Sequence, residues 1–339
     1  MAPGRTDRAT MPPRFRHEIL DRRERLATGP TPIRDLGALR RGLWLKDEGA
    51  IHAEYGGNKV RKLEFLLHGA TERVVTIGAA GSHHVLATAV LGSRRGHQVE
   101  ATAFPRPETR HAREVLRAAT ALARLHGEAD YSRAIARARA LAGQDTFLPA
   151  GGSSPRGTLG WVLAGLELAE QVAQGLLPEP RRAFMPVGTA GTILGAAIGF
   201  RLGGLRTRVV AVRVVPVEWL AREEIAALGD AVLELLGLRS ITSSDLAIDL
   251  DDASLGGGYG EVTSASRRAI ERGGELGLRL EPTYTGKALG AALGVDPAGG
   301  PDLFWQTHST APLTSLLAKA PPLPPALEAM LLPRDWSVA

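Results

Sequence analysis

The sequence predicts an α/β protein with two open parallel sheets, each covered by helices on both faces. Short apolar runs such as RVVTI (73–77) and RVVAVRVV (208–215) alternate with longer helical patterns, which is typical of parallel sheets. Three apolar runs end in turns rich in glycine or hydroxyl groups, where open sheets bind ligands; these are RVVTIGAAGS, FMPVGTAGT and DLFWQTHST. The length of 339 residues allows about two domains.

The individual elements follow from apolar periodicity and from turn residues. The first 30 residues are polar and arginine-rich, and we expect an arm there with one short helix around residues 17–25. The predicted strands cover residues 43–45, 73–77, 98–104, 183–187 and 208–215. The predicted helices cover residues 59–69, 82–95, 108–126, 132–142, 158–175 and 190–202. The proline-rich run PPLPPALEAM (321–330) is interpreted as a C-terminal tail.

Composition excludes several classes of protein. The net charge of +5 is small for this length and the charges are interspersed, so we expect no nucleic-acid partner. No apolar run reaches membrane-spanning length and no secretion signal is evident, so we expect a cytoplasmic protein without membrane contact. The absence of cysteine excludes disulfides, thiolate metal sites and cysteine nucleophiles.

Lysine is scarce, with five residues against thirty-six arginines, yet Lys59 and Lys62 lie one helical turn apart in EYGGNKVRKLEF. A lysine with a lowered pKa attacks carbonyl groups, whereas arginine stays charged and forms no imine. This stretch therefore predicts lysine carbonyl chemistry. The alternative is a helix that is capped by Asn58 and carries two solvated lysines on its first turn.

A glycine-rich turn connects the strand AFMPV to the next helix. Its glycines allow close backbone approach, the free N–H groups of the helix point at a ligand, and the threonine hydroxyls add donors. We expect an anion to bind there, and the alternative is a tight turn without a ligand. Neither GxxxxGK[ST] nor GxGxxG is present. The residues of this turn are Gly188, Thr189, Ala190, Gly191 and Thr192.

Ser82, His83 and His84 follow the strand RVVTI and a glycine turn. Ser82 and the N–H groups after it are candidates to hold a carboxylate, and His83 or His84 to shape or protonate a substrate. The alternative is a serine that only caps its helix. Adjacent helical histidines point about 100 degrees apart, and HExxH is absent, so no metal site is expected.

Two of the four tyrosines, Tyr259 and Tyr284, lie in glycine-flanked turns, GGGYG and EPTYTGK. A tyrosine in a pocket moves protons or orients a ring. Exposed turn tyrosines are the alternative.

From TPIRDL to THST, these motifs resemble the pyridoxal-phosphate enzymes that include 1-aminocyclopropane-1-carboxylate deaminase and D-cysteine desulfhydrase. The resemblance implies the tryptophan-synthase-beta-like fold, also called fold type II. It implies that Lys59 forms the imine with pyridoxal 5'-phosphate and that Lys62 helps to bind the phosphate. It also makes the turn Gly188 to Thr192 the phosphate loop, and places Tyr259 and Tyr284 beside cofactor and substrate.

Other positions indicate which reaction of the family the resemblance favours. Thr285 corresponds to the residue near the pyridine nitrogen, where the deaminases carry glutamate and the desulfhydrases threonine. This match favours β-elimination after α-proton removal. His83 replaces the asparagine beside the cofactor's ring hydroxyl, and the family's His-Thr-Gly-Gly becomes HSTA (308–311), which leaves Ser309 as a substrate contact. These departures predict an altered substrate.

Several alternatives stay open on the sequence alone. The same cofactor supports ring opening, racemisation or β-replacement, and a non-catalytic member of the fold or a plain phosphate-binding protein are further hypotheses. We expect an arm (1–30), a large cofactor-binding domain (31–68 and 161–339) and a small inserted domain (69–160). The resemblance also implies a homodimer and an amino-acid substrate.

Overall fold

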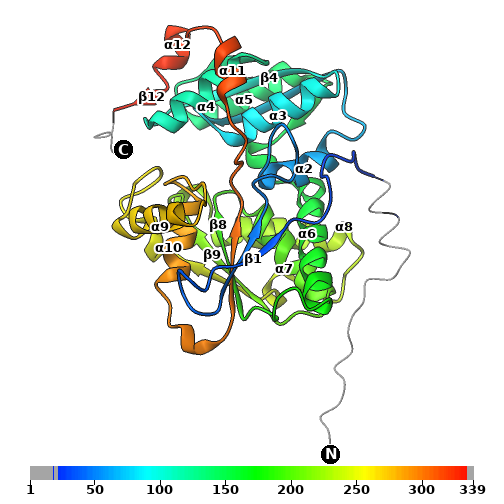
Figure 1. Ribbon diagram of the computed structural model, residues 1–339. Helices are drawn as coiled ribbons and strands as arrows, with labels where there is room; N and C mark the ends of the chain where they lie inside the picture. Colours follow the sequence, from blue (N-terminus) through cyan, green and yellow to red (C-terminus); the bar gives the residue numbers. More distant parts are fainter. Residues whose placement is uncertain (1–17, 19–21, 334–339) are drawn as a thin grey trace, which may run out of the picture.

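The computed structural model describes residue 18 and residues 22–333, which form two mainly parallel sheets with helices around them (Figure 1). Within these residues, the larger sheet has six strands in the order β1-β2-β11-β8-β9-β10, in which β1 pairs antiparallel with β2 and the other neighbours pair in parallel. The strands are β1 (Ile33–Asp35), β2 (Leu43–Asp47), β8 (Arg182–Val187), β9 (Arg208–Arg213), β10 (Ile248–Asp251) and β11 (Asp302–Gln306).

The smaller sheet is parallel throughout its described strands, in the order β6-β4-β3-β7. Its two central strands, β3 and β4, pair along their whole length. The strands are β3 (Arg73–Ala79), β4 (Gln98–Phe104), β6 (Ala123–Gly127) and β7 (Thr146–Leu148). A short parallel pair joins β5 (Arg106–Pro107) to β12 (Leu331–Leu332).

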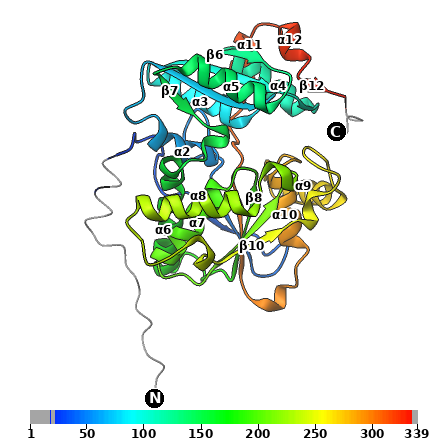
Figure 2. The same cartoon turned by 180° about the vertical axis from the view of Figure 1, so that it is seen from behind.

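Helices cover both faces of each sheet, which confirms the predicted α/β class (Figures 1 and 2). On the larger sheet, α6 to α8 pack on one face and α9 and α10 on the other; on the smaller sheet, α3 and α4 lie opposite α5. The helices are α2 (Asn58–Leu66), α3 (His83–Arg94), α4 (Arg110–Thr120), α5 (Tyr131–Ala142), α6 (Pro155–Ala173), α7 (Gly191–Leu202), α8 (Arg222–Leu235), α9 (Ser264–Glu275), α10 (Thr285–Leu293), α11 (Thr314–Lys319) and α12 (Pro325–Glu328). Among these helices, none combines the length and the apolar character needed to cross a membrane.

Helix α2 lies between the two sheets and is fixed by a buried ion pair. Arg61 donates two hydrogen bonds to Glu48, at 2.7 and 3.0 Å, and a third to Glu167 of α6 at 3.1 Å. The indole of Trp305 on β11 also donates to Glu48, at 3.0 Å. Because Glu48 is fully buried and Arg61 is 4% exposed, both charges depend on these partners.

Two predicted elements are wrong. The predicted helix over residues 108–126 ends at Thr120, because Ala123–Gly127 pairs with β4 as strand β6. The proline-rich run is not a tail: Leu327 and Leu331 pack on Ala112 and Leu116 of α4. Leu327 lies on α12 and Leu331 on the short strand β12, so the run forms two ordered elements. Of the predicted helix over residues 17–25, residues 17 and 19–21 lie outside the described residues, and residues 22–25 are not helical.

The positions of the elements bear on the domain boundaries. The predicted boundary after residue 160 falls inside α6, which packs along its length on α7. Helices α11 and α12 pack against α4 and β6 of the smaller sheet. We propose that the inserted domain ends before Pro155 and that residues 314–332 belong with it.

The buried ion pair yields a prediction about stability. Glu48→Ala leaves the Arg61 guanidinium without its main counter-charge, and we expect a loss of about 3–5 kcal/mol in unfolding free energy. Asp249→Ala breaks an exposed pair with Arg208 and serves as the control, with an expected loss below about 1 kcal/mol. Urea unfolding followed by the fluorescence of the buried tryptophans measures both. Equal losses in the two variants would contradict the assigned role of Glu48.

Candidate active site

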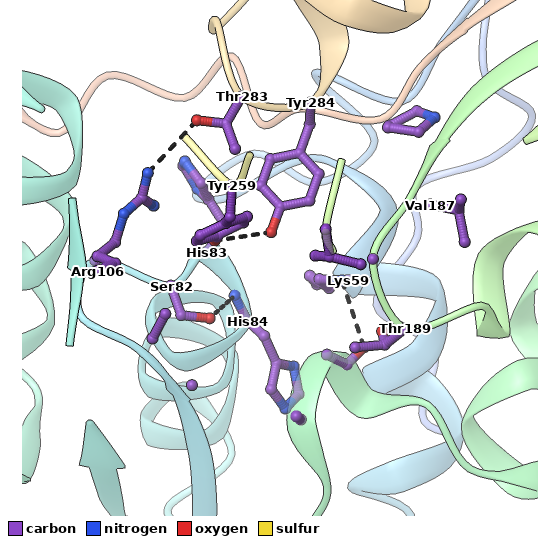
Figure 3. A pocket seen from close by; sticks show the side chains of 18 of the residues that line it. Lys59, Ser82, His83, His84, Arg106, Val187, Thr189, Tyr259, Thr283 and Tyr284 are labelled. Atoms are coloured by element: carbon purple, nitrogen blue, oxygen red, sulfur yellow. Dashed lines mark hydrogen bonds between the residues drawn. The ribbon is translucent and has the colours of Figure 1, made fainter. Parts of the chain in front are cut away.

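A cavity of about 640 Å³ lies where both sheets present the carboxyl ends of their strands. Its wall includes the ends of β3, β8 and β11 and the start of α2, so the three turns singled out in the sequence meet in one place. Figure 3 shows the side chains that converge there. Parallel open sheets bind their ligands at this edge. The predicted site residues that line the cavity are Lys59, Ser82, His83, His84, Gly188, Thr189, Ala190, Thr192, Tyr259, Tyr284, Thr285 and Ser309.

Lys59 reaches the cavity from the first turn of α2. The helix starts after Gly57, which has a φ of 85° and leaves no space for a side chain beside the backbone of residues 307–309. The Lys59 ammonium group lies 3.4 Å from the carbonyl oxygen of Gly151. Burial lowers the pKa of Lys59 to about 8. A larger fraction of this amine than of an ordinary lysine is therefore uncharged near neutral pH, and the uncharged form is the one that acts as nucleophile or base.

Lys62 follows one turn later and points at the glycine-rich turn. Its ammonium group donates to the Gly151 carbonyl at 3.0 Å and to the Ser153 hydroxyl at 2.8 Å, and Ser153 lies 2.8 Å from the Thr189 hydroxyl. Burial and then the charge of Lys59 lower the pKa of Lys62 well below its usual value. Within the described part of the chain, neither amine forms a salt bridge with a carboxylate.

The turn after β8 has the shape of an anion cradle. Ala190 has a φ of 58° and is the one non-glycine residue in the left-handed region among those described. A Cβ atom on Gly191 would lie 3.0 Å from the Lys62 ammonium and 2.8 Å from the Ser153 hydroxyl. The missing side chain leaves room at the N-terminus of α7, where free N–H groups attract an anion. These donors and the adjacent Lys59 fit the phosphate and aldehyde of pyridoxal phosphate.

Ser82 caps helix α3 at another side of the cavity. Its hydroxyl accepts a hydrogen bond from the backbone N–H of His84 at 3.2 Å (Figure 3). Gly78 and Gly81 hold this turn: a Cβ on Gly78 would lie 2.5 Å from that of Ser82, and Gly81 has a φ of 77°. The turn therefore presents a hydroxyl and a helix N-terminus to the cavity.

The two adjacent histidines separate as their spacing predicts. His84 is buried against the sheet, with its ring 2.9 Å from the Thr76 hydroxyl. His83 instead meets His111 of α4 and His308 of the turn after β11, with the Nε2 atoms of His83 and His111 2.7 Å apart. The Tyr55 hydroxyl hydrogen-bonds the other ring nitrogen of His83. Burial lowers the pKa of all three clustered histidines, that of His308 to about 4.

Tyr259 and Tyr284 form a pair in the wall of the cavity, with their hydroxyl oxygens 3.0 Å apart (Figure 3). The guanidinium of Arg106 lies 4.9 Å from the ring centre of Tyr259. Burial, together with the neighbouring Tyr259, raises the pKa of Tyr284 well above its usual value. Tyr284 therefore keeps its proton near neutral pH, and its hydroxyl is able to donate a hydrogen bond.

Thr285 and Ser309 are both buried, at 0% and 7% exposure. Thr285 lies beside Glu281, whose carboxylate accepts from the backbone N–H groups of residues 283–285 at 2.7–2.9 Å. Ser309 accepts from the backbone N–H of Gly56 at 3.0 Å, so it ties the turn after β11 to the loop before Lys59.

Sequence reasoning missed four residues of this site: Tyr55, Arg106, His111 and Glu281. Tyr55 was detectable, because it directly precedes the glycine pair of the lysine motif and tyrosine is rare in this chain. Arg106 and His111 belong to no local motif, and only the tertiary fold brings them to the cavity.

Comparison with known proteins agrees with this geometry. Residues 24–302 match the family described as "Pyridoxal-phosphate dependent enzyme". The chain is 33% identical to nocardicin C-9' epimerase of Nocardia uniformis subsp. tsuyamanensis over 88% of its length and 95% of that protein. It is 32% identical to a putative 1-aminocyclopropane-1-carboxylate deaminase of Pyrococcus abyssi (80% and 86% covered) and 29% identical to D-cysteine desulfhydrase of Salmonella paratyphi B (83% and 92%).

Solved structures place the fold. A structure titled as an ACC deaminase homologue superposes with a TM-score of 0.77 at 24% identity, covering 91% of this chain and all of that one. A pyridoxal 5'-phosphate-dependent aspartate racemase gives a TM-score of 0.60 at 14% identity, with 89% and 97% covered. The chain thus belongs to the pyridoxal-phosphate dependent enzymes, in the family of 1-aminocyclopropane-1-carboxylate deaminase and D-cysteine desulfhydrase.

Proposed function

We propose that this enzyme removes the α-proton of a small amino acid and expels its β-substituent. The products are a 2-keto acid, ammonia and the protonated leaving group, with one water molecule consumed. The observation that carries the proposal is Lys59, an amine with a pKa of about 8 at the junction of the phosphate cradle and the cavity. Bound pyridoxal phosphate supplies the electron-accepting ring that lets the Cα–H bond of an attached amino acid break.

Separate groups hold the two ends of the cofactor in this proposal. Lys59 binds its aldehyde carbon, and Lys62 with the N–H groups of the turn Gly188 to Thr192 binds its phosphate. The buried Lys62 amine supports this assignment, because it has no carboxylate partner among the described residues and a phosphate dianion would stabilise its charged form. His83 is then the neighbour of the ring hydroxyl, where the family has asparagine.

The substrate carboxylate binds at the start of α3. The Ser82 hydroxyl and the first N–H groups of this helix form a donor set for an anion. His84 supports this turn through its bond to Thr76. We therefore assign it a positioning role, which replaces the substrate contact expected from the sequence.

Proton handling at the β-carbon falls to the tyrosine pair. Tyr284 keeps its proton because its pKa is raised, its hydroxyl is held by that of Tyr259, and Arg106 lies over the Tyr259 ring. A neutral donor at this position delivers a proton to a leaving group. Thr285 supports elimination further, because its hydroxyl carries no charge into the site.

Epimerisation is a second candidate, and one observation favours it: the 33% identical relative is an epimerase. Both reactions begin with removal of the α-proton, and they differ in whether a β-substituent leaves. Proton NMR in deuterium oxide separates them, because epimerisation inverts and deuterates Cα without forming keto acid. Ring opening and β-replacement are likewise distinguished by their products.

The homodimer stays a prediction from the resemblance, and the cytoplasmic location stays a prediction from the sequence. Sedimentation equilibrium tests the first, with twice the chain mass expected.

The proposal predicts the behaviour of Lys59→Ala. We expect no imine absorption band and a rate of keto-acid formation lowered by at least about 10²–10⁴-fold, because the variant lacks both the covalent anchor and the base. D-Cysteine, L-cysteine and 1-aminocyclopropane-1-carboxylate are the first substrates to assay. Lys319→Ala, at an exposed lysine, is the control. Wild-type protein without the band after incubation with cofactor would overturn the enzyme assignment and favour a non-catalytic role.

The lowered pKa of Lys59 predicts a pH dependence for cofactor capture by cofactor-free protein. Only the uncharged amine attacks the aldehyde, so we expect the capture rate to rise with pH around a midpoint near 8. The rate then levels off above about pH 9. Stopped-flow absorbance measures it. A rate that keeps rising toward the ordinary lysine pKa of 10.5 would contradict the burial of this amine.

The tyrosine pair gives a graded prediction. Tyr284→Phe removes the proton donor, and we expect kcat for elimination to fall about 10²–10⁴-fold with KM changed far less. Tyr259→Phe removes only the group that orients Tyr284, so its effect is smaller. Tyr131→Phe, on the same cavity wall, is the matched control. A larger loss of kcat in Tyr259→Phe than in Tyr284→Phe would contradict this assignment and make Tyr259 the proton donor.

A further inference from the structure

Three histidines from separate elements converge on one point of the cavity wall. His83 starts α3, His111 lies on α4, and His308 follows β11. Their ring centres are 4.8 to 5.3 Å apart, and one potential ligand nitrogen from each lies within 4.8 Å of the others. Among the described residues, this is the one group of three or more histidine or acidic side chains close enough to share an ion.

The His83 ring is oriented from its outer side. The Tyr55 hydroxyl hydrogen-bonds Nδ1 of His83, which leaves Nε2 directed at His111. Metal-binding histidines commonly use their second nitrogen in this way, because the outer hydrogen bond fixes the tautomer and the ring angle. Tyr55 is itself 1% exposed and cannot move away into solvent. The cluster therefore has an outer support as well as potential ligands.

We propose that His83, His111 and His308 bind one divalent transition-metal ion of the Zn²⁺ type, with a fourth coordination position open to the cavity. Imidazole nitrogen suits Zn²⁺, Ni²⁺ and Cu²⁺, and three histidines with an open position form a common zinc arrangement. The chain contains no cysteine, so no thiolate competes for the ion.

Binding requires ring movements of up to about 1.5 Å, because the ligand nitrogens now lie within 4.8 Å of one another and a tetrahedral site places them about 3.3 Å apart. Zn–N bonds of about 2.0–2.1 Å in a tetrahedral site place ligand nitrogens about 3.3 Å apart. The Nε2 atoms of His83 and His111, now 2.7 Å apart, must separate by about 0.6 Å. At present one of these nitrogens carries the proton shared between them. A neutral imidazole can move that proton to Nδ1, so the ion replaces a hydrogen bond without changing the charge of either ring.

The surrounding charges are of both signs. Lys59 and Arg106 act on His83, whereas the carboxylate of Glu281 acts on His111 and His308. Because all three histidines line the cavity that contains Lys59, the open position faces the space assigned to the substrate. The proposal does not depend on which reaction the enzyme catalyses.

Metal content tests the proposal directly. Tag-free holoenzyme is dialysed against Zn²⁺ and its zinc is counted by mass spectrometry; we expect one ion per chain. His111→Ala and His308→Asn should bind more than about 100-fold more weakly, a larger loss than outer-support changes cause. His97→Ala, a histidine on the surface that hydrogen-bonds the Thr71 carbonyl, is the control and should retain the ion.

Cobalt substitution provides a readout that catalysis does not affect. Co²⁺ in a four-coordinate nitrogen site gives strong visible bands, and we expect them in wild-type holoenzyme but not in His83→Asn. Tyr55→Phe should keep the bands and weaken binding about 10–100-fold. Thermal unfolding confirms that each variant is folded. Wild-type protein that binds no Zn²⁺, or a folded His111→Ala that binds it as tightly as wild type, overturns the proposal.

Discussion

The position of α2 depends on the buried pair of Arg61 and Glu48, and most of the active site depends on α2. This pair lies one residue from Lys62 and two from Lys59, so it fixes the side of the helix on which both amines emerge. Gly160 allows α6 to approach, because a Cβ there would lie 1.9 Å from the Arg61 carbonyl oxygen. A charge pair on one side of the helix thus sets the geometry of the amines on the other.

The phosphate cradle destabilises the same helix that the ion pair stabilises. Two buried amines without a carboxylate partner destabilise the protein until an anion arrives, because each loses hydration on folding. The buried pair of Arg61 and Glu48 offsets this cost, because it holds α2 in place before the cofactor binds. The cofactor therefore binds more tightly, since little of its binding energy is needed to order the site.

The sequence predicts those parts of the site that form within one local segment. Lys59 and Lys62 share a helical turn. Gly188 to Thr192 form a strand-to-helix turn, and its glycine and threonine residues are enough to predict its geometry. His111 could not be found, because its neighbours His83 and His308 are distant in sequence and nothing local distinguishes it. Strand β6 was missed for the same reason. ARLHG (123–127) is a strand because it pairs with the edge of β4, and the local sequence alone favours a continued helix.

The strand order has a consequence for synthesis of the chain. Strand β11 lies between β2 and β8 (Figure 1), so the larger sheet remains in two pieces, each with an unpaired edge, until residue 306 has left the ribosome. The strands of the smaller sheet, in contrast, are all made by residue 148. Unpaired strand edges can pair with other chains and aggregate, so the growing polypeptide exposes such an edge for most of its translation. The strand that completes the sheet also delivers the turn containing His308 and Ser309, and the pocket therefore forms only when the sheet is closed.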